Sequence, residues 1–483
     1  MFGLSLSNDD WLLLSLLFFL FAVALTFYYA WAVKKDGVLD PISVFLFFYC
    51  LFVLPLPVRS YITKEIVGDV TDHLPGLLPY MPWAVFLSAV GLPFFVWGYY
   101  SKLSQRIARR LPRPRAGIHS RTAFVLLTTL SLVLLSLLAR NEGGLLNFIL
   151  LGYGSTAEMF GKGYLAVGLP WLFIASLFLL YGYALRHTRS DLIFFIGAVF
   201  AVAIIHVVLG SRGILMYMGL TVLIYWNAAV KPISAKLLTA IGVTCFIGLN
   251  LLGIVRSSNY SSLSDVWARS SAVEGSKLDN NVLYTLSIGE FVVPFETLPQ
   301  MAKSVGTEIR PQLGLTYLRA PLYWIPAAIY PSRPIPLSTW YMEKFYGGGY
   351  GANQGRAFFF TAEGYLNFGF LGVLGVMLMW GWFLGAVHQY RIAAGGEPGA
   401  LMLYALTVAF IFRGIAGDFV SMFAGLPEQS LSAAVLGIWV VNWGRGRQRV
   451  WRRTPAASRT ARPPSAYYSN AKPALGGNAS DRH

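Results

Sequence analysis

Charged residues are scarce in this chain of 483 residues, because Asp, Glu, Lys and Arg together make up only 12% of it. A soluble domain carries about 25%. Cysteine is nearly absent as well: Cys50 and Cys245 both fall inside apolar runs, which excludes a disulfide framework and a zinc-finger site. The composition therefore excludes an ordinary soluble enzyme and a disulfide-stabilised domain.

Sequence motifs for metal or nucleotide binding are also missing. No histidine occurs between His206 and His388, and the long segment 256–365 contains no Asp-x-Asp. The glycines between Gly347 and Gly351 do not follow a strand and open a helix, as a phosphate-binding loop requires. We expect no metal site and no nucleotide cofactor.

Long apolar runs are abundant instead. The chain is 56% hydrophobic with a mean hydropathy of +0.57, and each apolar run of 18 or more residues is long enough to span about 30 Å of hydrocarbon. We predict an all-α polytopic membrane protein with about eleven transmembrane helices. Their expected positions are 11–33, 41–58, 80–100, 121–139, 164–185, 191–209, 213–230, 236–255, 366–388, 399–416 and 425–443.

Lysine and arginine are concentrated in alternate loops, which predicts the orientation of the chain. The basic loops lie near 34–35, 101–120, 186–189, 231–236 and 391, and in the tail from 445. With eleven spans these loops all face one side, which the positive-inside rule assigns to the cytoplasm. The N-terminus is then outside and the C-terminus inside. We attribute the net charge of +16 to this orientation and to anionic lipid headgroups, and not to nucleic acid.

Four regions follow from this reading. Residues 1–255 form an N-terminal transmembrane bundle of eight spans, and 366–443 form three C-terminal spans. Between them, 256–365 is a long extracytoplasmic loop, with interfacial helices expected near 283–298 and 313–330. Residues 444–483 form a basic cytoplasmic tail that is predicted to be disordered.

Several charged residues map to the outer depth of the predicted membrane, where an ionisable side chain is a functional candidate. They are Arg212, Arg256, Glu363, Arg413 and Asp418. Guanidinium groups bind phosphate through paired hydrogen bonds. A cluster of Arg212, Arg256, Arg356 and Arg413 therefore predicts a diphosphate-bearing substrate.

Purely structural roles are also open for these residues. Arg413 and Asp418 are alternatively an ion pair, and Arg256 alternatively reaches from its helix end to the membrane surface. Glu363 is alternatively a cap that interacts favourably with a helix N-terminus.

Three sequence segments resemble a known family. They are the turn Gly210-Ser211-Arg212-Gly213 and the run Thr361-Ala362-Glu363-Gly364-Tyr365-Leu366-Asn367-Phe368-Gly369, with Pro331-Ser332-Arg333-Pro334 in the long loop between them. In these motifs, over residues 200–390, and in its overall architecture the chain resembles the bacterial oligosaccharide repeat unit polymerases, the Wzy-type O-antigen polymerases.

The resemblance implies a metal-independent membrane glycosyltransferase of the GT-C type in the bacterial inner membrane, with its active site facing the periplasm. Such an enzyme transfers the growing glycan from undecaprenyl diphosphate to the terminal sugar of another lipid-linked repeat unit. The implied partners are membrane lipids, a flippase that supplies the substrate and a chain-length regulator.

The chemistry of this transfer requires a general base for the acceptor hydroxyl and positive charge for the leaving diphosphate. Because no histidine lies in the long loop, a carboxylate is the expected base, with Glu363 first and Glu290 second. Arg212 is the leading arginine. The further candidates are Arg319, Arg333, Asn367 and Asp418.

Three other functions compete with this one. A ligase of the O-antigen type would use a different acceptor. A flippase or exporter of lipid-linked glycan would need a basic cavity reachable from both sides of the membrane. A membrane scaffold would tolerate alanine at Arg212 and Glu363.

Overall fold

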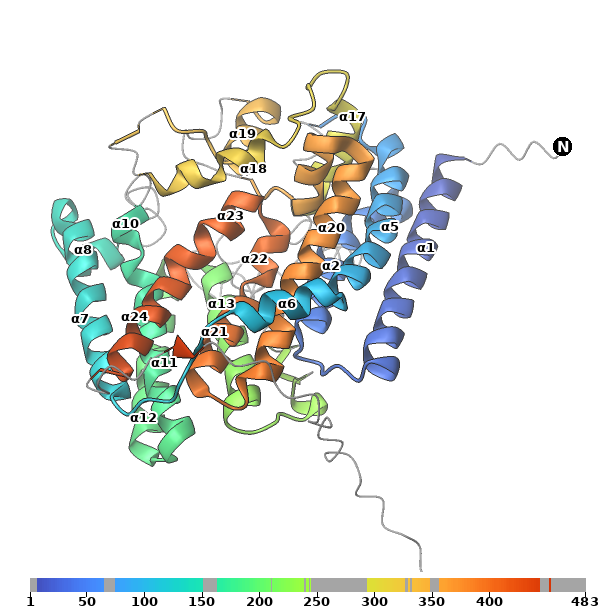
Figure 1. Cartoon of the computed structure of the whole chain (residues 1–483). Helices are drawn as coiled ribbons and strands as arrows, with labels where there is room; N and C mark the ends of the chain where they lie inside the picture. The colour runs from blue at the N-terminus through green and yellow to red at the C-terminus, as the bar shows by residue number, and fades with distance from the viewer. Residues whose placement is uncertain are drawn as a thin grey trace, which may run out of the picture.

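The fold is a bundle of α-helices, seen in a computed structural model (Figure 1). The structure describes residues 7–64, 74–150, 163–209, 211–238, 240–242, 244, 293–325, 329–330, 332–347, 356–443 and 451–452. Within these ranges the extended structure consists of one short antiparallel pairing of β1 (Arg113–Pro114) with β2 (Trp451–Arg452), and one isolated bridge between Val305 and Ile309. The chain is an all-α polytopic membrane protein, as predicted.

Nine helical stretches among the described residues are long and apolar enough to cross a membrane. They are Asn8–Val33, Pro41–Thr63, Leu78–Tyr99, Ser120–Leu138, Tyr164–Arg186, Arg189–Val208, Phe360–Ala394, Pro398–Ala416 and Phe419–Val441. Each coincides with one of the eleven predicted spans. The span predicted at 213–230 is a helix, α13 (Arg212–Ala229), but it is not among the nine. Most of the span predicted at 236–255, from residue 245 onward, lies outside the described residues.

Most of these stretches combine several helical elements. In chain order they are α1 (Asn8–Tyr28) with η1 (Tyr29–Val33), α2 (Pro41–Val53) with α3 (Pro55–Thr63), η2 (Leu78–Tyr80) with α5 (Met81–Tyr99), α7 (Ser120–Leu138), α10 (Gly163–Ala166) with α11 (Gly168–Arg186), α12 (Arg189–Val208), α20 (Phe360–Ala394), α21 (Pro398–Ala409) with α22 (Ile411–Ala416), and α23 (Phe419–Phe423) with η6 (Pro427–Leu431) and α24 (Ser432–Val441). The shorter connecting helices are α6 (Lys102–Arg110), η3 (Ala139–Glu142), α8 (Leu145–Leu150), α17 (Val293–Ser304), α18 (Leu315–Arg319), η5 (Ala320–Trp324) and α19 (Leu337–Phe345).

Helix α5 packs closely against α20 and so positions the element that carries Glu363. A Cβ added at Gly381 would lie 2.1 Å from the backbone oxygen of Phe95, and one added at Gly385 would lie 2.1 Å from that of Tyr99. Two glycines four residues apart let helix backbones approach closely inside a membrane, where helix association depends on packing. The α5–α20 pair is therefore fixed by backbone contact.

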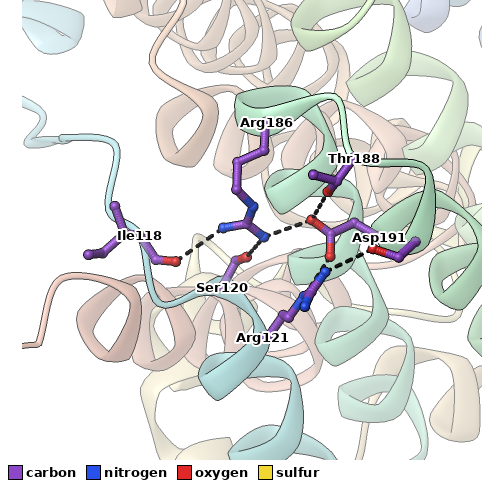
Figure 2. Close-up of polar contacts among 7 residues, drawn as sticks. Ile118, Ser120, Arg121, Arg186, Thr188 and Asp191 are labelled. Atoms are coloured by element: carbon purple, nitrogen blue, oxygen red, sulfur yellow. Dashed lines mark hydrogen bonds and ion pairs between the residues drawn. The ribbon is translucent and has the colours of Figure 1, made fainter.

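At one end of the bundle, which we call the basic end, polar contacts join loops that are distant in sequence. Buried Asp191 accepts hydrogen bonds from Arg121 and Arg186, both at 2.7 Å, and from Thr188 at 2.6 Å (Figure 2). Arg186 also donates to the carbonyl of Ile118. These contacts tie the start of α7 to the turn between α11 and α12.

The opposite end, which we call the hairpin end, holds the short helices α17, α18 and α19 around the start of α20 (Figure 1). The interfacial segment predicted at 283–298 is described only from residue 293 onward. From there α17 is buried, with Phe295 and Leu298 fully covered, and it packs against α20 and α5. The segment predicted at 313–330 does expose apolar side chains, among them Leu313, Leu318 and Ile329, as an interfacial segment does.

Candidate functional site

The first eight residues of α20 double back on the rest of that helix. Phe368 and Gly369 leave the helical conformation, and Gly369 has φ +60° and ψ −138°, a region that essentially only glycine occupies. A Cβ on Gly372 would lie 1.8 Å from the backbone oxygen of Gly364, and the rings of Phe360 and Trp380 are 5.4 Å apart. Segments 360–367 and 370–394 therefore form a tight helical hairpin. The prediction that Glu363 precedes a helix starting at 366 was wrong, because the helix begins at Phe360 and reverses at Gly369.

The hairpin carries Glu363 into a buried position with 1% of its surface exposed. Its Oε1 accepts a hydrogen bond from the Thr316 hydroxyl at 2.7 Å, and its Oε2 accepts one from the backbone N–H of Phe419 at 2.5 Å. A buried carboxylate requires such partners, since leaving water is costly. Both donors are neutral, and no cation forms an ion pair with Glu363 within the described residues.

Asn367 lies one helical turn after Glu363 and fixes a loop onto the hairpin. Its Oδ1 accepts from the N–H of Gly314 at 2.9 Å, and its Nδ2 donates to the Thr316 hydroxyl at 2.8 Å and to the Glu363 carbonyl at 2.9 Å. Asn367 thus holds the hydroxyl that bonds to Glu363. This gives the predicted residue a positioning role.

Asp418 reaches the same area from the start of α23. Its Oδ1 accepts from the N–H and hydroxyl of Ser421, and its Oδ2 accepts from the N–H of Leu337 at 2.9 Å. Asp418 forms no ion pair with Arg413, whose guanidinium donates instead to Oε1 of Gln429 at 2.6 Å. Asp418 therefore caps α23 and attaches the start of α19, and the ion-pair interpretation does not hold.

Four of the predicted residues act on Tyr323 through their charges, and they are Glu363, Asp418, Arg319 and Arg333. All are close enough to act electrostatically on its hydroxyl. Burial and the negative charges of Asp418 and Glu363 raise the pKa of Tyr323 against the opposing effect of the two arginines. The pKa of nearby Tyr317 is also raised, first by burial and then by Glu363.

Arg319 and Arg333 are the two predicted arginines that act on Tyr323. Arg319 is exposed and Arg333 is partly exposed. Among the described residues neither guanidinium makes a hydrogen bond or an ion pair. Two such groups beside buried carboxylates suit an anion that arrives from outside the chain.

Arg356 is held differently, because it forms a bidentate pair with buried Glu296. Its Nε and one terminal nitrogen contact the two carboxylate oxygens, the latter at 2.9 Å, and the guanidinium lies 4.4 Å from the centre of the Tyr346 ring. Burial opposes the charged form, but the bonds and charge of Glu296 outweigh it and raise the pKa of Arg356. This arginine fastens α17 to the segment that precedes α20.

For the remaining predicted residues, Arg212, Arg256 and Glu290, the structure gives less detail. Arg212 begins α13, where Tyr217 donates to Ser430 at 2.7 Å and so attaches that helix to η6. Arg256 and Glu290 lie outside the described residues. The structure therefore does not bring the four arginines of the predicted diphosphate cluster together in its described part.

Sequence reasoning missed Thr316, Tyr317 and Tyr323. Thr316 and Tyr317 lie in α18 and Tyr323 in η5, within the segment expected to be interfacial, and Thr316 is 51 residues from its partner Asn367. No periodicity or motif marks such a contact. The only signal was the run of polar and aromatic residues inside an otherwise apolar stretch.

At this site the described residues contain no group of three His, Cys, Asp or Glu side chains able to hold a metal ion. Comparisons of the chain with models of protein families, with curated proteins and with solved structures found no match.

Proposed function

We propose that this protein is a membrane glycosyltransferase that polymerises a lipid-linked surface glycan, the O-antigen type included. It transfers the growing glycan from undecaprenyl diphosphate to a sugar hydroxyl of another lipid-linked repeat unit. The proposal places the enzyme in the bacterial inner membrane with the hairpin end facing the periplasm.

One observation supports the proposal most directly. A buried carboxylate occurs at the same end of the bundle as two arginines that have no carboxylate partner in the described structure. Within the described residues Glu363 has only neutral donors. Arg319, Arg333 and Glu363 all act electrostatically on Tyr323. A base and a diphosphate-binding group are the two parts that this transfer requires.

In the proposed reaction the acceptor hydroxyl gives its proton to Glu363 as its oxygen bonds to the anomeric carbon. The bond from that carbon to the diphosphate oxygen breaks, and the lipid diphosphate leaves with the electron pair. Arg319 and Arg333 stabilise the charge that develops on the diphosphate, because guanidinium groups stay protonated in a partly dry site.

The Thr316 hydroxyl occupies the place that the acceptor hydroxyl needs. It lies 2.7 Å from the Glu363 carboxylate, within the range for proton transfer. In the proposed reaction, substrate binding requires the Thr316 hydroxyl, and with it the five-residue helix α18, to move away from Glu363.

The test is complementation of a deletion strain with Glu363→Gln, which keeps the shape of the side chain and removes the base. Its matched control is Glu343→Gln, an exposed glutamate of α19. We expect Glu363→Gln to reduce polymer by about 10²–10⁴-fold, with equal protein in the membrane by immunoblot and single repeat units still on the surface. Glu343→Gln should give the wild-type ladder of polymer lengths on a gel.

Other outcomes assign other functions. A normal ladder with Glu363→Gln removes this residue from the mechanism. Loss of all surface glycan on deletion, single repeat units included, contradicts a polymerase and favours a ligase or a flippase.

A further inference from the structure

A second polar cluster lies at the basic end, at the opposite end of α20 from Glu363. Asp36 and Asp40 come from the loop between η1 and α2, and His388 comes from α20. Their ligand atoms all lie within 4.8 Å of one another. His388 is 19 residues beyond Gly369, so at 1.5 Å per residue it is about 28 Å from the hairpin turn. The cluster therefore belongs to a different site.

The imidazole of His388 faces both carboxylates without bonding to either. Its Nε2 is 3.5 Å from Oδ1 of Asp36, and its Nδ1 is 3.9 Å from Oδ2 of Asp40. Both distances exceed those of a normal hydrogen bond. Two atoms that each lie about 2.1 Å from a shared ion are separated by about 3.0–3.4 Å, depending on the coordination angle. The gap between His388 and Asp36 is thus close to that of two ligands of one cation.

Two buried polar atoms at the cluster lack a partner within the described structure. His388 is 7% exposed and its Nδ1 makes no hydrogen bond, and Tyr99 is 2% exposed with an unbonded hydroxyl. The rings of these two residues are 5.6 Å apart. Buried polar groups in proteins normally find partners, so the unbonded Tyr99 hydroxyl indicates a bound species at this place. An ion bound by Nε2 of His388 leaves Nδ1 of the same ring facing Asp40.

The other contacts of the two carboxylates orient them toward the imidazole. Tyr100 donates to Oδ2 of Asp36 at 2.5 Å, which leaves Oδ1 facing His388. Arg391 contacts Oδ1 of Asp40 at 2.9 Å, and the N–H of Gly37 donates to Oδ2 at 2.6 Å. Hydrogen bonds of this kind around metal ligands fix their direction.

We propose that Asp36, Asp40 and His388 bind a divalent transition-metal ion of the zinc class. One imidazole nitrogen and two carboxylate oxygens suit Zn²⁺ or Co²⁺, with water in the remaining position. The ion joins the loop between the first two spans to the end of α20. This structural site is separate from the proposed glycosyl transfer and does not depend on it.

The experiment uses the full-length protein in detergent, purified with a histidine-free tag and treated with chelator. We expect calorimetry to show one Zn²⁺ per chain, and X-ray absorption of the wild type to show one imidazole nitrogen among ligands at about 2.0–2.1 Å. The absorption measurement needs no variant, so it holds even where a substitution impairs folding.

Three variants locate the ion. His388→Gln should weaken Zn²⁺ binding by at least about 100-fold, and Tyr100→Phe, which removes only an orienting hydroxyl, by about 10–100-fold. His119→Gln, an exposed histidine in the loop before α7, should bind as the wild type does. The proposal is overturned if the wild type binds neither Zn²⁺ nor Co²⁺, if the absorption spectrum lacks an imidazole, if His388→Gln binds normally, or if His119→Gln loses binding.

Discussion

The two ends of the bundle satisfy their buried carboxylates in opposite ways. At the basic end, Asp191 is paired with Arg121 and Arg186 (Figure 2). At the hairpin end, Glu363 and Asp418 receive hydrogen bonds from hydroxyl and backbone N–H groups, while Arg319 and Arg333 have no ion-pair partner in the described structure.

This difference separates charges that hold the fold from charges that remain available to a ligand. A carboxylate that is neutralised by its own chain has a structural role, and the arginines that bind it are already engaged. A carboxylate with neutral donors leaves nearby arginines able to bind an external anion. The pair of Arg356 and Glu296 shows that the hairpin end also contains one arginine of the structural kind.

The largest expected effect comes from removing the available arginines. Arg319→Ala combined with Arg333→Ala should lower glycan polymerisation by about 10²–10³-fold, since in the proposed reaction each stabilises charge in the transition state. Protein stability should not change, because neither side chain has a partner to lose among the residues that the structure describes. The measurement is polymer length and amount at matched membrane expression, with exposed Arg310→Ala as the control. If the double variant were less stable but still made normal polymer, these arginines would have a structural role and no role in binding an anion.

The complementary change at the basic end should act on stability alone. Arg121→Leu with Arg186→Leu leaves fully buried Asp191 without a cation, at a cost of about 3 kcal/mol in the free energy of unfolding. Arg121→Leu by itself should cost at most about 1 kcal/mol, because this side chain is 58% exposed and Arg186 remains. Thermal unfolding in detergent measures both. If the Arg121→Leu, Arg186→Leu variant were as stable as the wild type, the ion pairs of Asp191 would not hold the fold, and the proposed difference between the two ends would be wrong.

The smallest expected effect tests the turn that carries Glu363. Gly369→Ala should destabilise the protein by about 1–3 kcal/mol, because the backbone there has φ +60° and ψ −138°. Gly375→Ala is the matched control, since a Cβ there meets no atom within 4 Å and the position is helical. Unfolding temperatures compare the two variants. Equal temperatures would mean that the hairpin is not constrained at Gly369.

The spanning helices were predictable because each depends on local composition, and a run of apolar residues needs no partner to be recognised. The hairpin was not, since only two residues, Phe368 and Gly369, leave the helical conformation between segments 360–367 and 370–394. Glu363 was predicted from its charge and depth. Its partners Thr316 and Phe419 were not, because they are 47 and 56 residues away along the chain.

Arg413 and Arg356 show the same limit of prediction from sequence. Their charge and position suggested one diphosphate cluster, but Gln429 and Glu296 hold them in separate places. Which of several arginines is engaged depends on tertiary contacts that sequence spacing does not encode.

The distance of four residues between Glu363 and Asn367 has a consequence of its own. Because each helical residue advances by about 100°, this spacing places the carboxylate and the amide on one side of segment 360–367, where both reach Thr316. One inserted residue between them would turn one away from the other. A search for comparable sites in other proteins should therefore retain the interval as strictly as the residue types.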